Sequence, residues 1–318
     1  MRLCRAKTEP GESQLAFFYD DYIIPVPPVY EAYRMAGYGA SPLFPAPCRD
    51  TLGYLPPNWE GYRMLERLSS VADAAGDEED LQWPLEDVYL DLPLPMPRKV
   101  LCLAGNYAEH IEESGWKAPK KEETFPFFFM KPPTTTVRPC GSCIALPHTS
   151  PDHIDWEVEL VAVIGAYVKD VTPEEARDAI AGYTVGLDMS NRKLRLNPNR
   201  IVQDRTAFQE WLCGKWHDGF APIGPCIVPA DDDFDPMACA ISLSVNGEIM
   251  QDSNTGNMVF DVHELVSYAS KIMTLEPGDL IMTGTPSGVG DARGRYLKSE
   301  DYIEATIEGI GTLTVSVV

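Results

Sequence analysis

The sequence predicts an α+β fold that is mostly β, namely a mixed β-sandwich or roll with peripheral helices, preceded by a small N-terminal α/β domain. Short apolar segments with the two-residue alternation of strands recur through the last two thirds of the 318 residues. Helical segments between them are few, which argues against a doubly wound parallel sheet. The sequence pattern changes near residue 95. We therefore expect an N-terminal domain at residues 1–95 and a larger domain at residues 96–318.

The first ninety or so residues mix strand and helix patterns. Residues 15–26 (LAFFYDDYIIPV) predict a short strand pair around an acidic turn. Residues 28–38 and 58–75 have helical spacing, and residues 76–80 (GDEED) form a polar break. Residues 88–105 contain three prolines and indicate an extended linker that enters a strand.

The larger domain consists mainly of short predicted strands. They are residues 99–105, 125–132, 157–165, 181–190, 226–229, 241–250, 279–286, 301–310 and 311–318. Helical patterns occupy residues 106–115, 172–180 and 260–273. Thr172 is suited to cap the second of these helices, and Pro173 fits its first turn.

Composition excludes several classes of partner. The chain has 26 Lys and Arg residues against 48 Asp and Glu residues, a formal net charge of −22 that repels a phosphate backbone, so we expect no nucleic acid partner. No apolar stretch has the length of a bilayer span and the first residues lack the apolar run of a secretory signal, so we expect a cytoplasmic protein without membrane contact.

Eight cysteines in a chain of this length predict reduced thiols rather than a disulfide framework. Cys140 and Cys143 form a single CGSC motif in what we interpret as a proline-flanked loop. The motif is compatible with a redox pair or half of a zinc site, but no second CxxC accompanies it, and incidental loop thiols are the simpler interpretation.

The most informative segment is IDWEVELVAVIG, residues 154–165. Alternation along a strand places Glu157 and Glu159 on one face. Burying two like charges so close together is costly unless a cation binds both, so we interpret them as ligands of a hard divalent metal. Asp188, at the end of another apolar strand, would complete an all-oxygen set that favours Mg²⁺, Mn²⁺ or Ca²⁺. The alternative is the solvated face of an edge strand.

Three further segments carry candidate chemistry. His110 and Glu113 lie three residues apart on one helix face, which suits a general base oriented by a carboxylate, or alternatively an acidic surface helix. Lys215 lies among Trp211, Trp216 and Phe220, where it is either a cation–π partner or a catalytic electrophile. The glycine-rich residues 283–290 (TGTPSGVG) can present N–H groups and the Thr285 hydroxyl to an anion, or can form a plain turn.

Together these segments resemble the fumarylacetoacetate hydrolase family, from about residue 97 to residue 318. The matching segments, in the family's order, are LAGNYAEHIEESG, PFFFMKPPTT, IDWEVELVAVIG, AGYTVGLDMSNR, GKWHDGFAPIGP, VNGEIMQDSNTGNMVFDVHELVSYAS and LEPGDLIMTGTPSGVG. The resemblance implies a β-roll that is usually a homodimer, with a divalent metal, Mg²⁺ first and Mn²⁺ or Ca²⁺ as alternatives, on Glu157, Glu159 and Asp188.

It further implies that His110 and Glu113 form a dyad on a lid over the substrate, with Lys215 as a polarising residue. Thr285 and Gly284 would lie near the substrate carboxylate. Arg192 fits a substrate contact, although the family usually continues with an acid and soon a glutamine, whereas residues 193–208 (KLRLNPNRIVQDRTAF) form a longer segment here.

The family acts on 2-oxo acids and 1,3-dicarbonyl compounds, so the resemblance implies a small-molecule 2-oxo or diketo acid as the binding partner. Our first hypothesis is a metal-dependent hydrolase that cleaves a C–C bond in an acylpyruvate or related 2,4-diketo acid through a metal-stabilised enolate. The second is an oxaloacetate decarboxylase, hydratase or isomerase that uses the same site. The third is a non-catalytic binding member of the fold, against which the intact set of polar residues counts.

Overall fold

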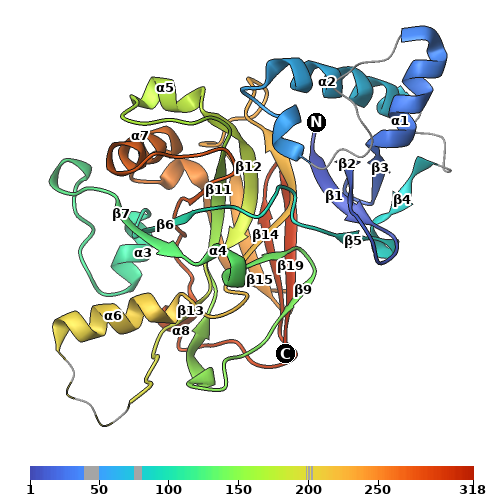
Figure 1. The fold of residues 1–318 in the computed structure, drawn as a ribbon. Coiled ribbons are helices and arrows are strands. Elements are labelled where there is room, and N and C mark those ends of the chain that lie inside the picture. Colours follow the sequence, from blue (N-terminus) through green and yellow to red (C-terminus); the bar gives the residue numbers. More distant parts are fainter. Residues whose placement is uncertain (39–49, 75–80, 198, 200, 202) are drawn as a thin grey trace.

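The structure is a computed structural model that describes residues 1–38, 50–74, 81–197, 199, 201 and 203–318 (Figure 1). The predicted polar break at residues 76–80 lies outside the described residues. The strands are β1 (Leu3–Lys7), β2 (Gln14–Phe18), β3 (Tyr22–Pro25), β4 (Trp83–Pro84), β5 (Tyr89–Leu90), β6 (Val100–Ala104), β7 (Phe127–Lys131), β8 (Val137–Pro139), β9 (Ser142–Ile144), β10 (Ile154–Asp155), β11 (Val158–Ile164), β12 (Ile180–Leu187), β13 (Ser190–Asn191), β14 (Ala221–Pro229), β15 (Ala240–Val245), β16 (Glu248–Asn254), β17 (Leu280–Met282), β18 (Tyr302–Ile307) and β19 (Gly311–Val317). The helices are α1 (Val26–Tyr33), α2 (Trp59–Ala74), α3 (Ala108–Glu113), α4 (Pro133–Thr136), α5 (Pro173–Arg177), α6 (Asp204–Gly214), α7 (Val262–Ile272) and α8 (Gly290–Arg293).

Two mixed sheets make up the body of the molecule, which confirms the predicted α+β fold with peripheral helices. The larger one has the order β4-β3-β2-β1-β14-β12-β11-β17-β6-β7, and the second has the order β16-β15-β18-β19-β9. A short pair, β10 and β13, leads into the ends of β11 and β12. Most neighbours are antiparallel, whereas β17 pairs with β6 in parallel.

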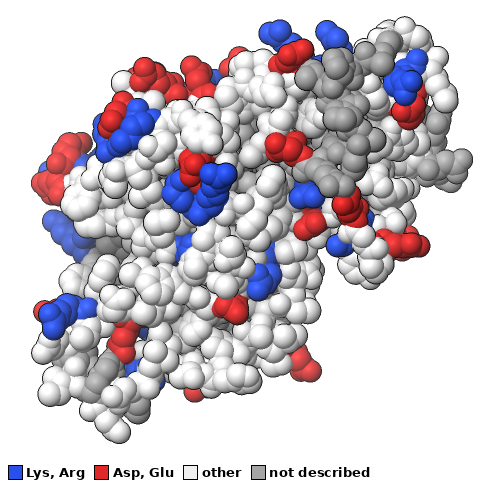
Figure 2. Space-filling model, in the orientation of Figure 1, with Lys and Arg blue, Asp and Glu red and all other residues white. Residues whose placement is uncertain are grey.

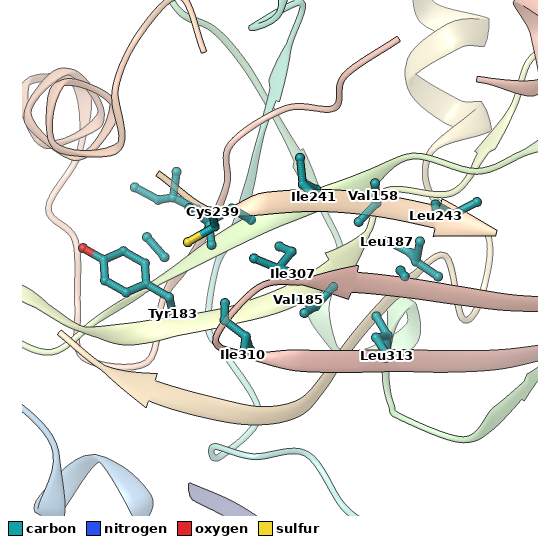
Figure 3. Close-up of a cluster of buried hydrophobic side chains, with 14 of the residues drawn as sticks. Val158, Tyr183, Val185, Leu187, Cys239, Ile241, Leu243, Ile307, Ile310 and Leu313 are labelled. Atoms are coloured by element: carbon teal, nitrogen blue, oxygen red, sulfur yellow. The ribbon is translucent and has the colours of Figure 1, made fainter. Parts of the chain in front are cut away.

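The core lies between the inner faces of the two sheets. Along β15, Ile241 and Leu243 are buried while the alternating Ser242 and Ser244 are half-buried, as expected for a strand with one face toward the core. These side chains pack with Val158, Val185 and Leu187 of β11 and β12 (Figure 3). Burial on both sheets therefore fixes the register of β11 and β12, the strands that carry the acidic candidate residues.

The N-terminal strands extend the larger sheet. Leu3 of β1 pairs with Ile227 of β14, so β1, β2 and β3 continue this sheet beneath α1 and α2 (Figure 1). The Tyr62 hydroxyl of α2 donates to the Asp231 carboxylate and connects the N-terminal region to the loop after β14. The division of the chain between residues 95 and 96 stays a prediction.

Helix starts follow the capping pattern of the sequence. Thr172 and Glu175 form a capping box at α5 with Pro173 in its first turn, as predicted, and Asp261 with Glu264 forms another at α7. The Ser267 hydroxyl of α7 donates to the Val171 carbonyl at 2.7 Å, so α5 and α7 pack together beside the larger sheet (Figure 1).

Three local predictions were wrong. Residues 241–250 are not one strand but the hairpin β15–β16, because Asn246 and Gly247 adopt the positive φ values of a tight hairpin turn. The CGSC segment is not a loop: it is a turn at Gly141 between β8 and β9, and Cys143 lies in β9. The segment after Arg192 contains α6, which the sequence interpretation missed.

The negative formal charge is not gathered into one patch on the face shown in Figure 2. Acidic and basic side chains stand singly or in small groups there, separated by broad uncharged areas. Among the described residues, none of the helices combines the length and the apolar character that a bilayer crossing requires.

Candidate metal centre and catalytic cavity

The three predicted metal ligands lie together at the ends of β11 and β12. Val158 pairs with Leu187, so Glu157 and Asp188 follow directly at the same end of the strand pair, and Asp188 N–H donates to the Glu157 carbonyl at 2.9 Å. One carboxylate oxygen from each of Glu157, Glu159 and Asp188 lies within 4.8 Å of the others. All three side chains are buried, with exposed fractions of 4%, 1% and 1%.

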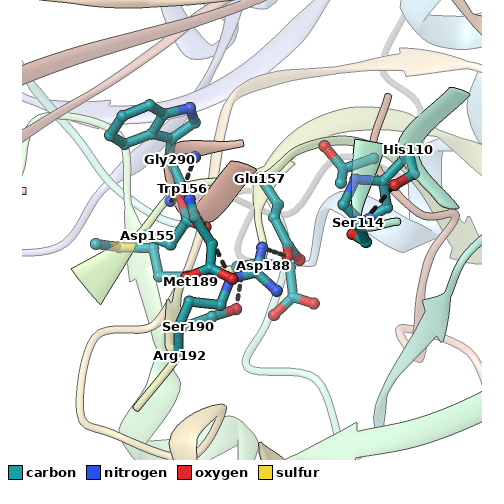
Figure 4. Close-up of polar contacts among 12 residues, drawn as sticks. His110, Ser114, Asp155, Trp156, Glu157, Asp188, Met189, Ser190, Arg192 and Gly290 are labelled. Carbon is teal, nitrogen blue, oxygen red and sulfur yellow. Dashed lines mark hydrogen bonds and ion pairs between the residues drawn. The ribbon is translucent and has the colours of Figure 1, made fainter. Parts of the chain in front are cut away.

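The strand is interrupted just before this cluster. β10 ends at Asp155 and β11 begins at Val158, so Asp155 does not continue the row of Glu157 and Glu159. Its carboxylate instead accepts from Arg192 Nε at 2.7 Å and from the backbone N–H of Gly290 and Asp291 (Figure 4). Asp155 thus positions Arg192 at the edge of the cluster.

Two lysines and this arginine neutralise most of the cluster. Lys215 Nζ donates to Glu157 at 2.8 Å and to Asp188 at 2.7 Å. Arg192 also pairs with Glu157, and Lys131 pairs with the other oxygen of Asp188. In total, four largely buried carboxylates face three largely buried cations: Asp155, Glu157, Glu159 and Asp188 against Lys131, Arg192 and Lys215. One negative charge is left uncompensated.

Glu159 is the carboxylate of this cluster that has no paired cation among the described residues. It accepts from the Gly284 N–H at 2.7 Å. Burial, together with the charges of Asp188 and Glu157, raises its pKa well above the usual value. Burial alone would also raise the pKa of Glu157, but Arg192 and Lys215 outweigh it and lower that pKa. A cation bound between these carboxylates would favour the ionised form of Glu159.

The residues fit a hard divalent cation. Buried carboxylate oxygens are the ligands that such ions prefer, no His or Cys belongs to this cluster of described residues, and one excess negative charge awaits compensation. A sequence-based alternative, the solvated face of an edge strand, is wrong, because β11 lies between β12 and β17 and its side chains are buried.

The glycine-rich loop at residues 283–290 donates backbone N–H groups to side-chain carboxylates of the protein. Gly284 N–H donates to Glu159, Gly288 N–H to Glu113 at 2.7 Å, and Gly290 N–H to Asp155. Gly288 has φ +105°, and a Cβ there would lie 2.0 Å from the Met250 carbonyl oxygen, so only glycine fits. The loop is therefore more than a plain turn, since it holds three carboxylates of the site.

Thr285 lies in the same loop and is also buried. Its hydroxyl donates to the Val158 carbonyl at 2.9 Å and accepts from Gln251 Nε2 at 2.8 Å. The predicted contacts of Thr285 and Gly284 with a substrate carboxylate stay predictions. In the structure the Gly284 N–H donates to Glu159, and the Thr285 hydroxyl donates to the Val158 carbonyl; both partners are residues of β11.

His110 and Glu113 form the predicted pair on α3. His110 Nδ1 lies 2.7 Å from one carboxylate oxygen of Glu113, and the other oxygen accepts from Gly288 N–H. No hydrogen bond from a described residue reaches His110 Nε2. Both side chains are mostly buried, so the imidazole is oriented with one nitrogen available for proton transfer.

Lys215 lies among aromatic rings, although not all of those predicted. Its ammonium lies 5.2 Å from the Phe129 ring centroid and 5.6 Å from that of Trp211, whereas Trp216 points elsewhere and donates to the Met130 carbonyl. Burial lowers the pKa of Lys215, but Asp188 and Glu157 outweigh it and raise this pKa. The ammonium is thus charged, and it has both ionic and cation–π partners.

These groups share one cavity of about 380 Å³. Seven of the nine predicted site residues line it: His110, Glu157, Glu159, Asp188, Arg192, Lys215 and Thr285. Glu113 and Gly284 lie behind them and bond to His110 and Glu159. A larger cavity of about 660 Å³ lies between α2 and α5, but its carboxylates, such as Asp232 and Asp235, are exposed. We place the functional site in the smaller cavity, where the buried charges converge.

Comparisons with known proteins agree on one family. The family model described as fumarylacetoacetate (FAA) hydrolase C-terminal matches residues 99–318. A mitochondrial oxaloacetate tautomerase of Bos taurus is 38% identical over 237 residues, which cover 74% of this chain and 71% of the relative.

Two solved structures extend the likeness. A 5-carboxymethyl-2-hydroxymuconate delta-isomerase from Mycobacterium smegmatis has a TM-score of 0.67 and 32% identity, covering 100% of this chain and 98% of that one. A fumarylpyruvate hydrolase from Pseudomonas aeruginosa, in complex with Mn²⁺ and pyruvate, has a TM-score of 0.60 and 36% identity, covering 72% of this chain and 91% of that one.

Sequence reasoning missed Lys131 and Gln251. Lys131 ends β7 and is fully buried against Asp188 and the carbonyl of Met189. A lysine at the end of an aromatic strand pattern was the available signal. Gln251 holds Val158 N–H and Thr285 together, a role that nothing in its own segment indicates.

Proposed function

The chain belongs to the fumarylacetoacetate hydrolase family, and on this premise we propose that it is a divalent-metal-dependent hydrolase. Its substrate class is an acylpyruvate or a related 2,4-diketo acid, in which it cleaves a C–C bond. One observation carries the proposal: a carboxylate-oriented imidazole, His110, opens into the same cavity as the buried cluster of Glu157, Glu159 and Asp188.

We assign the metal to Glu157, Glu159 and Asp188, with Mg²⁺ as the first candidate and Mn²⁺ or Ca²⁺ as alternatives. When bound, the ion supplies open positions for the carboxylate and keto oxygens of a 2-oxo acid and stabilises negative charge on the keto oxygen. The charge balance supports this assignment, because a divalent ion turns the excess of one negative charge into one positive charge. That charge matches a substrate with one carboxylate.

The side chains of the cavity then have defined tasks. His110 Nε2 takes a proton from water, which attacks the distal carbonyl carbon, while Glu113 holds the imidazole through Nδ1. The C–C bond breaks, its electrons move onto the carbon next to the keto group, and that carbon takes up a proton. The products are a 2-oxo acid and a carboxylic acid. Lys215 and Arg192 stabilise negative charge at the edge of the cluster. Thr285 lines the cavity and would contact the substrate carboxylate, and Gly284 lies directly behind it, bonded to Glu159.

A second candidate is a proton shift or decarboxylation without water. The names of the oxaloacetate tautomerase and the isomerase among the relatives favour it. His110 would then move a proton between carbon and oxygen of a 2-oxo acid, and no water would need to enter. The intact cluster and dyad count against a non-catalytic binding role.

A panel assay distinguishes these candidates. The purified protein is incubated with Mg²⁺ and, separately, with acetylpyruvate, fumarylpyruvate or oxaloacetate, and the products are resolved by NMR. Release of pyruvate with the matching carboxylic acid supports the hydrolase. Keto–enol exchange or CO₂ release without hydrolysis would replace it with the second candidate, and no reaction in the presence of Mg²⁺, Mn²⁺ or Ca²⁺ would refute both.

We also propose that the chain forms a homodimer and that residues 1–95 and 96–318 are separate domains. The mass in solution, measured by light scattering, tests the first. Expression of residues 96–318 alone tests the proposed domain division. Because β1 pairs with β14 in the large sheet, its removal exposes an edge of that sheet, and a soluble fragment is a strict test. The expected cytoplasmic location stays a prediction.

A further inference from the structure

We propose that the substrate has a single carboxylate and an apolar group at its distal end, and that a second cavity lined by Phe125, Phe127 and Phe260 binds this group. The inference rests on the proposed function and adds the chemical class of the substrate. It follows from two independent observations: the cations of the catalytic cavity are already paired, and the adjoining cavity has no charged side chain.

The first observation concerns whether the catalytic cavity offers a cation to a second carboxylate of the substrate. Among the described residues that line the catalytic cavity, Arg192 and Lys215 are the Lys and Arg side chains. Arg192 pairs with Asp155 and Glu157, and Lys215 pairs with Glu157 and Asp188, so each cation already faces two carboxylates of the protein. The substrate's first carboxylate is compensated by the proposed metal. A second one at the distal end would have to displace an existing ion pair or remain without a cation, which is costly in a buried site.

The second observation is the adjoining cavity of about 220 Å³. It shares four lining residues with the catalytic cavity: Leu103, Ala104, Gly105 and Ile111. The two cavities therefore meet at the end of β6 and the start of α3. The rest of its lining is mainly proline, phenylalanine and valine, with one threonine, and includes no ionisable side chain.

The phenylalanine rings of this cavity are only partly covered by the protein. Phe125 and Phe127 are 50% and 52% exposed, and their ring centroids lie 4.3 Å apart. A contiguous exposed apolar surface can mark a ligand-binding groove, and here three phenylalanines line one cavity. The nearby Lys121 ammonium lies 5.7 Å from the Phe260 ring, but it is paired with Glu264 at 2.6 Å. A phenyl ring or short alkyl chain that extends from the catalytic cavity would cover these rings.

Binding of inert 2-oxo acids tests the inference without turnover. Calorimetry in the presence of Mn²⁺ compares pyruvate, 2-oxooctanoate and 2-oxoglutarate. Each buried methylene strengthens binding about fourfold, so 2-oxooctanoate should bind at least about tenfold more tightly than pyruvate. 2-Oxoglutarate should bind no more tightly than pyruvate. Tighter binding of 2-oxoglutarate than of 2-oxooctanoate would overturn the inference even if the protein is a hydrolase.

Turnover separates the two proposals. With Mg²⁺, kcat/KM for hexanoylpyruvate should exceed that for fumarylpyruvate by about tenfold or more. If fumarylpyruvate is the better substrate, the hydrolase proposal stands and the apolar class is wrong. If neither is cleaved, the hydrolase proposal fails, and the calorimetric comparison decides the class of the distal group by itself.

Variants of Phe127 identify the cavity. Because its ring is half exposed, Phe127→Ser should fold normally and lower the ratio of kcat/KM for hexanoylpyruvate to that for acetylpyruvate about tenfold, mainly through KM. Phe127→Arg should raise activity on fumarylpyruvate by supplying a cation. Tyr167→Ser, at an exposed aromatic that lines none of these cavities, is the matched control. An unchanged ratio in Phe127→Ser would place the distal group elsewhere.

Discussion

Replacement of Glu159 by glutamine should change two properties in opposite directions. In the metal-free protein this carboxylate lies near Glu157 and Asp188 and pairs with no Lys or Arg of the described residues. Two unit charges 4.8 Å apart repel by about 3 kcal/mol at an effective dielectric constant of 20. Partial protonation and the Gly284 N–H offset much of this repulsion. Glu159→Gln should therefore stabilise the metal-free protein by about 2 kcal/mol, or about 3 °C in Tm for a chain of this length.

The same substitution should remove the stabilisation that a metal confers. At a metal concentration of 100 times Kd the wild-type protein gains about 2.7 kcal/mol, because only the folded state binds the ion. Differential scanning calorimetry with chelator and then with Mg²⁺ or Mn²⁺ measures both effects. Glu86→Gln, at an exposed glutamate of the N-terminal region, is the control. A full metal-induced shift in Glu159→Gln, or a lower Tm without metal, would contradict the assigned role.

Three further predictions follow from other parts of the structure. His110→Ala should lower kcat about 10²- to 10⁴-fold while the metal-induced Tm shift remains, as steady-state kinetics and calorimetry can check. Cys143 is exposed, whereas burial raises the pKa of Cys226 to about 12, so at pH 8 a thiol reagent should label Cys143 quickly and leave Cys226 unreacted until unfolding, by mass spectrometry of the labelled peptides. Lys99→Met leaves the fully buried Asp279 without its cation, and urea titration should show a loss of about 3 kcal/mol.

The acidic cluster was predictable because strand alternation and strand ends are local features. Glu157 and Glu159 share a parity in an apolar segment, and Asp188 ends another such segment. The pairing of β11 with β12 brings the three together. The dyad was predictable for a similar reason, since His110 and Glu113 are one helical turn apart.

The partners of these groups could not be predicted, because they depend on long-range pairing. Lys131 and Asp188 are far apart in the sequence, and only the packing of β7 and β12 around one cavity makes them an ion pair. The sequence left open whether the glycine-rich loop binds an anion or forms a plain turn, and it does not show that the loop donates to Glu113, Glu159 and Asp155. Helix α6 was missed because an Asn- and Pro-rich stretch precedes it and its apolar spacing is weak.

The backbone N–H groups of residues 283–290 restrict sequence change in one part of the site more than in another. A single turn of chain donates both to Glu113, the partner of His110, and to Glu159 of the acidic cluster. A shift of that turn would move both carboxylates at once. A mutation there would therefore disturb the His110–Glu113 pair and the acidic cluster together. The side chains of Phe125, Phe127 and Phe260 hold no carboxylate of the cluster, so a substitution at one of them would change the lining of the adjoining cavity and leave the bonds of this turn in place.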